Sequence, residues 1–149
     1  MDVDTTDDRI VIRLELPAGA GTVWQALVDP KHVGSWWGAH LQMDVRPGGR
    51  VVGRWNDGSR EVTTTGRFTH LEPPQTLQLA WAEDDWPAET QVEFSLAGGD
   101  GAGRTELVLV HSGWESLPRA RRADLMRHQA ADWSHCMRNL ADYVAELAA

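Results

Sequence analysis

The sequence predicts an α+β fold: a curved antiparallel sheet of about six to seven strands around a long C-terminal helix, with two short helices after the first strand. Three observations predict it. Apolar and polar residues alternate in several short runs between residues 9 and 111, which is typical of half-buried strands. Glycine and proline clusters separate these runs, as they separate the strands of antiparallel hairpins. After Pro118 the apolar period lengthens to that of a helix, so one long helix is expected at the C-terminal end.

The length of 149 residues fits one domain. Residues 1–8 carry aspartates at four positions and show no alternation, so they are predicted to form a disordered acidic tail. The folded domain is therefore expected to span residues 9–149.

The first strand is predicted by the alternation of residues 10–16, and Pro17 with the glycines after it ends that strand. Residues 22–28 have one apolar side and indicate a short helix. Asp29 followed by Pro30 predicts the start of a second short helix, since Asp is a good N-cap and Pro suits the first helical position. That helix is expected to run to about Trp37.

Six further strands are indicated by period-two patterns. Asp57-Gly58 is a hairpin sequence, and the glycines of residues 98–103 indicate a second hairpin loop. The strands are expected at residues 41–46, 51–55, 61–72, 77–81, 92–96 and 104–111.

The C-terminal helix is predicted by apolar residues at alternating spacings of four and three: Met126, Ala130, Trp133, Met137, Leu140, Val144 and Leu147. Such a stripe is the buried face of a helix lying on the sheet. A single sheet covered mainly by one helix must curl around it. A cavity between sheet and helix is therefore expected.

Composition excludes several classes of protein. The net charge of −8 argues against binding nucleic acid, which requires Lys and Arg to neutralise phosphates, and against an anionic membrane surface. The single cysteine excludes an internal disulfide and a thiolate metal cluster. The acidic start is unlike a signal peptide, and no apolar run approaches the ~18 residues of a membrane span. A cytoplasmic protein is expected.

Tryptophan is the unusual component, with eight residues against two Phe and one Tyr. Such large amphipathic rings are enriched where proteins bind something, although they also simply fill cores. Trp24 is expected in helix–sheet packing, and Trp86 and Trp114 in loops. The residues expected to line a ligand cavity are Trp36, Trp37, Met43, Trp55, Phe68, Trp81, Phe94, His111, Trp133 and Met137.

No catalytic residue, metal site or cofactor is predicted. His128 and His135 share a helix side without further ligands, and no nucleotide-binding glycine motif occurs. His111 has two interpretations: a structural residue at a strand end, or a polar anchor at the cavity mouth. Cys136 is interpreted as a small buried apolar residue.

An ordered set of motifs supports a family resemblance. The set contains Val23-Trp24-Gln25-Ala26-Leu27 with Asp29-Pro30, Trp36-Trp37-Gly38, Arg46-Pro47-Gly48-Gly49-Arg50, Gly66 with Leu71-Glu72-Pro73, His111-Ser112-Gly113, and Trp133 before Leu140. Together they resemble the family of activator of Hsp90 ATPase homologue 1-like proteins, within the START/Bet v 1-like superfamily. The resemblance spans about residues 9–147 and implies the helix-grip fold.

The leading functional hypothesis is non-enzymatic binding of a hydrophobic small molecule, lipid-like or aromatic and polyketide-like, between sheet and C-terminal helix. One alternative is an enzyme of the cyclase or hydrolase type that uses the same cavity, with His111 or His70 transferring protons. Another, implied by the resemblance alone, is an Hsp90-type co-chaperone. A homodimer through a sheet edge or the short helices stays open.

Overall fold

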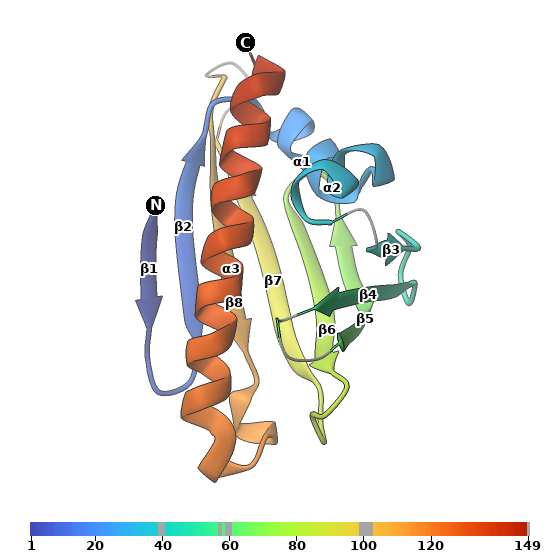
Figure 1. Ribbon diagram of the computed structural model, residues 1–149. Coiled ribbons are helices and arrows are strands. Elements are labelled where there is room, and N and C mark those ends of the chain that lie inside the picture. The colour runs from blue at the N-terminus through green and yellow to red at the C-terminus, as the bar shows by residue number, and fades with distance from the viewer. Residues whose placement is uncertain (39–40, 57, 59–60, 99–102, 149) are drawn as a thin grey trace.

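The computed structural model describes residues 1–38, 41–56, 58, 61–98 and 103–148. One antiparallel sheet of eight strands, in the order β1-β2-β8-β7-β6-β5-β4-β3, curves around a single long helix (Figure 1). The strands are β1 (Asp2–Thr5), β2 (Ile10–Leu16), β3 (Gln42–Met43), β4 (Arg50–Asn56), β5 (Glu61–Glu72), β6 (Thr76–Glu83), β7 (Thr90–Ala97) and β8 (Thr105–Ser112). The helices are α1 (Ala20–Val28), α2 (Pro30–Trp36), the short 3₁₀ helix η2 (Trp114–Ser116) and α3 (Arg119–Ala148). The predicted fold class is confirmed.

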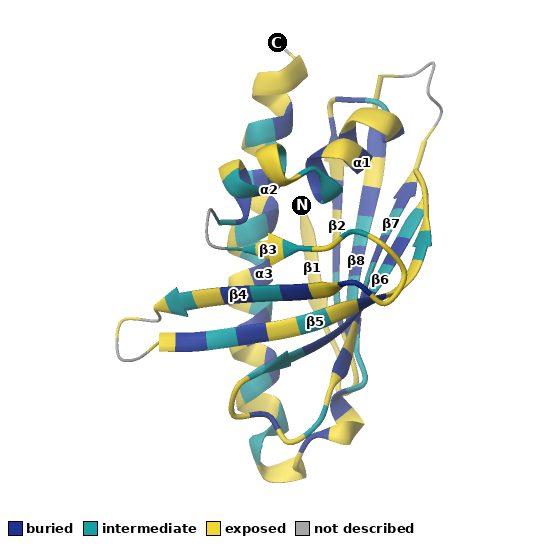
Figure 2. Ribbon diagram, turned by 90° about the vertical axis from the view of Figure 1, so that its right-hand side faces the viewer, coloured by how far each residue is buried: buried dark blue, intermediate teal, exposed yellow. Residues whose placement is uncertain are grey.

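The core lies between the concave face of the sheet and α3. In β2, β7 and β8 every second side chain is buried, and these are the side chains that face the helix. Five residues of the α3 stripe are buried, which gives the dark bands of the helix in Figure 2: Met126, Trp133, Met137, Leu140 and Val144. Ala130 of the stripe is half-buried. Leu147, the last residue of the predicted stripe, is exposed.

The N-terminal segment differs from the predicted disordered tail. Residues 2–5 form β1, which pairs with β2 from Asp2 opposite Arg13 to Thr5 opposite Ile10. All four of its side chains are exposed, so the strand is held by backbone hydrogen bonds to the sheet edge. A search for alternating apolar residues does not detect such a strand. It raises the strand number to eight and places the two short helices after the second strand.

Helix α2 begins as the sequence predicts. The Asp29 side chain accepts a hydrogen bond from the Lys31 backbone N–H at 3.0 Å, and Pro30 occupies the first helical position. Trp36 then donates from its indole to the Ala26 carbonyl of α1 at 2.7 Å. These contacts fix the end of α2, where Trp36 and Trp37 meet the core.

Two glycines allow β4 and β5 to approach their neighbours. A Cβ on Gly49 would lie 1.8 Å from the Asp44 carbonyl oxygen, and a Cβ on Gly66 would lie 2.4 Å from that of Ala80. No side chain fits at such distances, so the turn before β4 and the β5–β6 pairing both require glycine. Of the two predicted hairpin loops, Asp57 and residues 99–102 lie outside the described residues.

Within the described part of the chain, no helix combines the length and the apolar character that crossing a membrane requires.

Candidate ligand-binding site

A cleft of about 420 Å³ lies between α3 and the strands β4, β5 and β6. Figure 1 shows why it forms there: β4 and β5 turn away from the rest of the sheet and reach across toward the middle of α3. The volume is within the range of roughly 300–1,000 Å³ found for small-molecule pockets. Its lining residues are Trp37, Trp55, Asn56, Val62, Thr64, Trp81, Glu83, His128, Gln129, Asp132, Trp133, His135, Cys136 and Asn139.

Four tryptophans, one just after α2 and one each from β4, β6 and α3, provide most of the apolar lining. The rings of Trp37 and Trp81 are stacked, with centroids 5.9 Å apart and an interplanar angle of 13°. Trp133 of α3 packs against both, at 5.1 Å from Trp81 and 5.6 Å from Trp37. Trp55 is half-buried and donates its indole N–H to Thr64 Oγ1 at 3.0 Å. We call these four residues the tryptophan wall.

The other side of the cleft is polar and acidic. The buried Gln129 donates from its Nε2 to the Glu83 carboxylate at 2.9 Å. Burial raises the pKa of Glu83, and the charges of Asp132 and Asp85 raise it further, while the Gln129 hydrogen bond and His128 act in the opposite direction. Asp132 also lies 3.5 Å from His128 Nε2. Among the described lining residues there is no Lys or Arg.

The indole N–H of Trp81 has no hydrogen-bond partner among the described residues, although the ring is only 4% exposed. An unpaired buried donor costs about 1–3 kcal/mol. This part of the cleft is therefore less stable than a fully hydrogen-bonded core would be, and Trp81 is the ring on which Trp37 and Trp133 pack.

Behind the wall, His111 is fully buried and both of its ring nitrogens are occupied. Trp133 donates from Nε1 to Nδ1 at 3.0 Å, which assigns the proton to Nε2. Nε2 lies 2.6 Å from Thr90 Oγ1, and that hydroxyl donates to the Trp81 carbonyl at 2.9 Å. Burial lowers the pKa of His111 from 6.5 to about 3. This neutral imidazole links β6, β7, β8 and α3, and it orients Trp133.

Two further rings enclose His111. Trp114 is fully buried, donates to the His111 carbonyl at 2.9 Å, and has its ring centroid 4.3 Å from that of the imidazole. Trp86 packs on Trp114 at 5.5 Å. The sequence analysis assigned both tryptophans to loops. Both lie outside the strands, and Trp114 begins the 3₁₀ helix η2. Gly113, with φ of 83°, turns the chain at that point, and the Trp114 ring packs against His111.

The residues proposed from sequence as cavity lining fall into three groups. The cleft brings together Trp37, Trp55, Trp81 and Trp133. Five others are buried in the surrounding core: Trp36, Phe68, Phe94, His111 and Met137. Met43 lies on β3 beside a different hollow.

Sequence reasoning missed the polar lining residues. Glu83 ends β6 and shares a face with Leu77, Leu79 and Trp81, so extending the alternation by two residues would have found it. Gln129, Asp132 and Cys136 each immediately precede a residue of the predicted apolar stripe in α3. They therefore border the buried face of the helix, where a cleft beside it begins.

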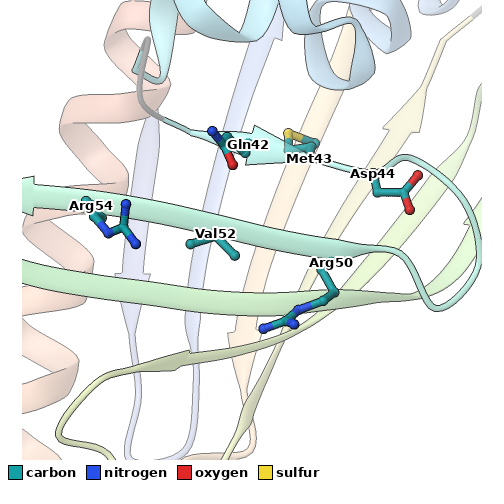
Figure 3. Close-up of a pocket in the computed structure, with 6 residues that line it drawn as sticks. All are labelled: Gln42, Met43, Asp44, Arg50, Val52 and Arg54. Carbon is teal, nitrogen blue, oxygen red and sulfur yellow. The ribbon is translucent and has the colours of Figure 1, made fainter.

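A second hollow, of about 690 Å³, lies on the outer face of β3 and β4 (Figure 3). Arg50, Val52 and Arg54 line it, and they alternate along β4 with the inward-facing Val51 and Gly53. No aromatic ring lines this hollow among the described residues. It is a broad surface depression, whereas the smaller cleft has an apolar wall.

Groups of three or more His, Cys, Asp or Glu side chains able to hold a metal ion do not occur in the described ranges. Cys136 lines the cleft, and burial, with a smaller effect of Asp132, raises the pKa of its thiol from 9.0 to about 12. The thiol is therefore protonated and a poor nucleophile at neutral pH.

A curved antiparallel sheet that grips a long C-terminal helix, with an aromatic cleft between them, defines a helix-grip protein of the Bet v 1-like class. Residues 17–145 match the family model described as Activator of Hsp90 ATPase homolog 1-like protein. The chain belongs to this family. No curated protein matches the chain significantly.

Solved structures agree with this assignment. A protein from Rhodobacter sphaeroides is 25% identical, with a TM-score of 0.76 over 98% of this chain and 99% of that one. DynU16, described as a putative protein in the dynemicin biosynthetic locus, is 29% identical with a TM-score of 0.73; the match covers 94% of this chain but only 48% of DynU16. The Aha1 dimer from Colwellia psychrerythraea is 22% identical, with a TM-score of 0.74 over 91% and 95% of the two chains, which shows the shared fold.

Proposed function

We propose that this protein binds a hydrophobic, aromatic or lipid-like small molecule in the cleft between α3 and strands β4–β6, and does not convert it chemically. The tryptophan wall is the observation that supports the proposal. It exposes ring surface to a space of about 420 Å³, and large apolar surfaces around a concave space are the usual environment of bound small molecules.

The relationship to DynU16 supports this proposal, because that protein is described as belonging to the dynemicin biosynthetic locus. The chain covers less than half of DynU16, so the inference concerns the shared domain. Members of this fold provide a cavity, and the ligand is set by the side chains that line it.

The chemistry of the lining favours binding over catalysis. His111, the proton-transfer group of the enzymatic alternative, is outside the cleft lining and has both nitrogens engaged. His70, the other candidate, is about half exposed and paired with Glu72 on the solvent side. Cys136 is the one thiol, and its raised pKa keeps it protonated. The lining does pair His128 with Asp132 at 3.5 Å, but among the described residues no hydrogen bond joins the Cys136 thiol to a base.

Titration with the neutral fluorophore N-phenyl-1-naphthylamine tests the proposal. Energy transfer from the tryptophan wall to the probe should saturate at one site. Trp55→Ala should weaken binding at least tenfold, because Trp55 is the wall ring that is only half-buried and its replacement spares the core. Met43→Ala, beside the outer hollow, is the matched control and should bind as the unsubstituted protein does. Absence of saturable binding, or an equal loss in both variants, would contradict the proposal.

The family match favours a second candidate, stimulation of an Hsp90 ATPase. It is tested by adding the purified protein to a bacterial Hsp90 and measuring ATP hydrolysis, with sedimentation analysis to determine whether the active species is a dimer. Unchanged hydrolysis at saturating protein would remove this candidate and leave the ligand-binding proposal intact.

A further inference from the structure

The two sides of the cleft differ in chemistry, and this difference restricts the ligand further. The tryptophan wall presents apolar ring faces, whose π electrons carry partial negative charge. Beside the wall, the lining holds the carboxylates of Glu83 and Asp132 and the imidazoles of His128 and His135, and no Lys or Arg lies among the described lining residues. The space between them is therefore a region of negative potential inside a protein whose net charge is −8.

Glu83 is the lining carboxylate that lies next to the tryptophan wall. It ends β6, two residues after Trp81 and on the same face of the strand. The one hydrogen bond that its carboxylate accepts among the described residues comes from Gln129. A carboxylate has about four acceptor positions, so Glu83 keeps acceptor capacity while having lost part of its hydration. A positive donor placed next to it would offset that loss.

We infer that the ligand is a planar aromatic molecule carrying a protonated amine, with its rings on the tryptophan wall and its ammonium group at the Glu83 carboxylate. This inference rests on the proposed binding function. A cation near indole faces gains cation–π attraction, most strongly where water is excluded. The same cation gains a charge-assisted hydrogen bond to the carboxylate.

Other ligand classes fit the cleft less well. A carboxylate or phosphate would face Glu83 and Asp132, and the described lining offers it no Lys or Arg; of the two lining histidines, His128 already pairs with Asp132 at 3.5 Å. A neutral aromatic molecule would fill the apolar side but would supply no positive donor to the half-buried Glu83 carboxylate. The carboxylates of Glu83 and Asp132 therefore favour a cationic ligand over a neutral one of the same shape.

Two probes of nearly equal shape separate the contribution of the ammonium group from that of the rings. They are 2-(2-naphthyl)ethylamine, which is cationic at neutral pH, and 2-(2-naphthyl)ethanol, which is neutral. Calorimetric titration should show roughly tenfold or greater preference for the amine, as expected for a hydrogen bond to a charged group. Glu83→Gln keeps the shape and should bind both probes equally. Glu93→Gln is the matched control, since Glu93 likewise accepts a hydrogen bond from a glutamine, Gln78, but lies outside the cleft lining.

The outcomes separate this inference from the proposed function. Equal affinity of the unsubstituted protein for both probes, or an amine preference that survives Glu83→Gln, overturns the inference while ligand binding stands. Failure of both naphthyl probes together with N-phenyl-1-naphthylamine overturns the proposed function itself. If Glu83→Gln does not fold, the unsubstituted protein supplies a second readout: its amine preference should fall as acidic pH protonates Glu83, and a preference independent of pH overturns the inference.

Discussion

At the scale of single residues, His111 has the clearest role. Its imidazole is neutral because the ring is fully buried, which lowers its pKa, and its two nitrogens contact Trp133 and Thr90. Its contribution is geometric: it accepts from the indole of Trp133 and so sets the plane of one ring of the cleft. The structural interpretation of this histidine, rather than that of a polar anchor at the cavity mouth, agrees with these contacts.

The depressed pKa of His111 makes stability depend on pH. In the unfolded chain the imidazole takes up a proton near pH 6.5, whereas in the folded protein it does so only near pH 3. Between these values the unfolded state binds more protons, so the free energy of unfolding falls as pH falls, by up to about 1.4 kcal/mol per pH unit. Above pH 6.5 the effect is absent.

Urea denaturation at a series of pH values measures this dependence. His111→Gln, which cannot titrate, should show a smaller slope over the window below pH 6.5. Carboxylates contribute equally to both proteins and cancel in the comparison. Identical slopes would show that His111 is not the titrating group.

Trp133 and Trp81 provide a second prediction, because they are neighbouring buried indoles that differ in hydrogen bonding. Trp133→Phe leaves His111 Nδ1 without its donor, whereas Trp81→Phe removes an N–H that has no partner among the described residues. Both changes remove a similar ring area. Trp133→Phe should therefore reduce the free energy of unfolding by about 1–3 kcal/mol more than Trp81→Phe. Thermal and urea unfolding measure the difference; a larger loss in Trp81→Phe would contradict the hydrogen-bond assignment.

At the scale of elements, α2 is short and depends on its cap. Seven residues form few internal hydrogen bonds, so the bond from the Lys31 N–H to Asp29 is a substantial part of its stability. Asp29→Ala should cost about 0.5–2 kcal/mol of stability. Because α2 leads into Trp37 of the wall, affinity for N-phenyl-1-naphthylamine should fall as well.

Asp29→Ser is the control for this change, since serine is an equally good N-cap. It should retain both stability and affinity. A loss in the serine variant as large as in the alanine variant would mean that the carboxylate acts by something other than capping.

Most of the helices and strands could be predicted from sequence, because each of them carries a local pattern of apolar residues. The bounds of β5 and the start of α3 follow from an alternation and a stripe that each bury one face. β1 could not be predicted in this way, because its residues bury no side chain and are held by pairing with β2 alone. A strand without a buried face leaves no period in the sequence.

At the scale of the whole molecule, the cleft results from the curvature of the sheet. Strands β2, β8 and β7 lie along α3, while β4 and β5 turn away from them and reach across toward the helix (Figure 1). The cleft lies between α3 and strands β4, β5 and β6, where this divergence begins. Sequence reasoning could identify inward-facing rings but not which of them border the space. Phe94 and Trp81 have the same pattern in their strands, yet only Trp81 lies at the divergence.

Cys136 allows the state of the whole cleft to be measured. It is the one cysteine of the chain, it lines the cleft, and the pKa of its thiol is raised to about 12. Since the thiolate is the reactive form, alkylation by iodoacetamide should be at least ~100-fold slower in the folded protein than in urea. A ligand between α3 and the sheet covers the sulfur and also stabilises the closed molecule. N-phenyl-1-naphthylamine should therefore slow the reaction in proportion to the fraction bound.

The control for this experiment is Ser116→Cys in a Cys136→Ser background, because Ser116 is exposed on η2 and away from the cleft lining. Its alkylation should be fast and independent of the probe. If the probe binds but leaves the rate at Cys136 unchanged, it occupies another part of the molecule, and the outer hollow of β3 and β4 becomes the site to test. If protection follows occupancy, α3 and strands β4–β6 both contact the ligand. The protected sulfur belongs to α3, and the rings that contact the probe come from α3 and from the strands.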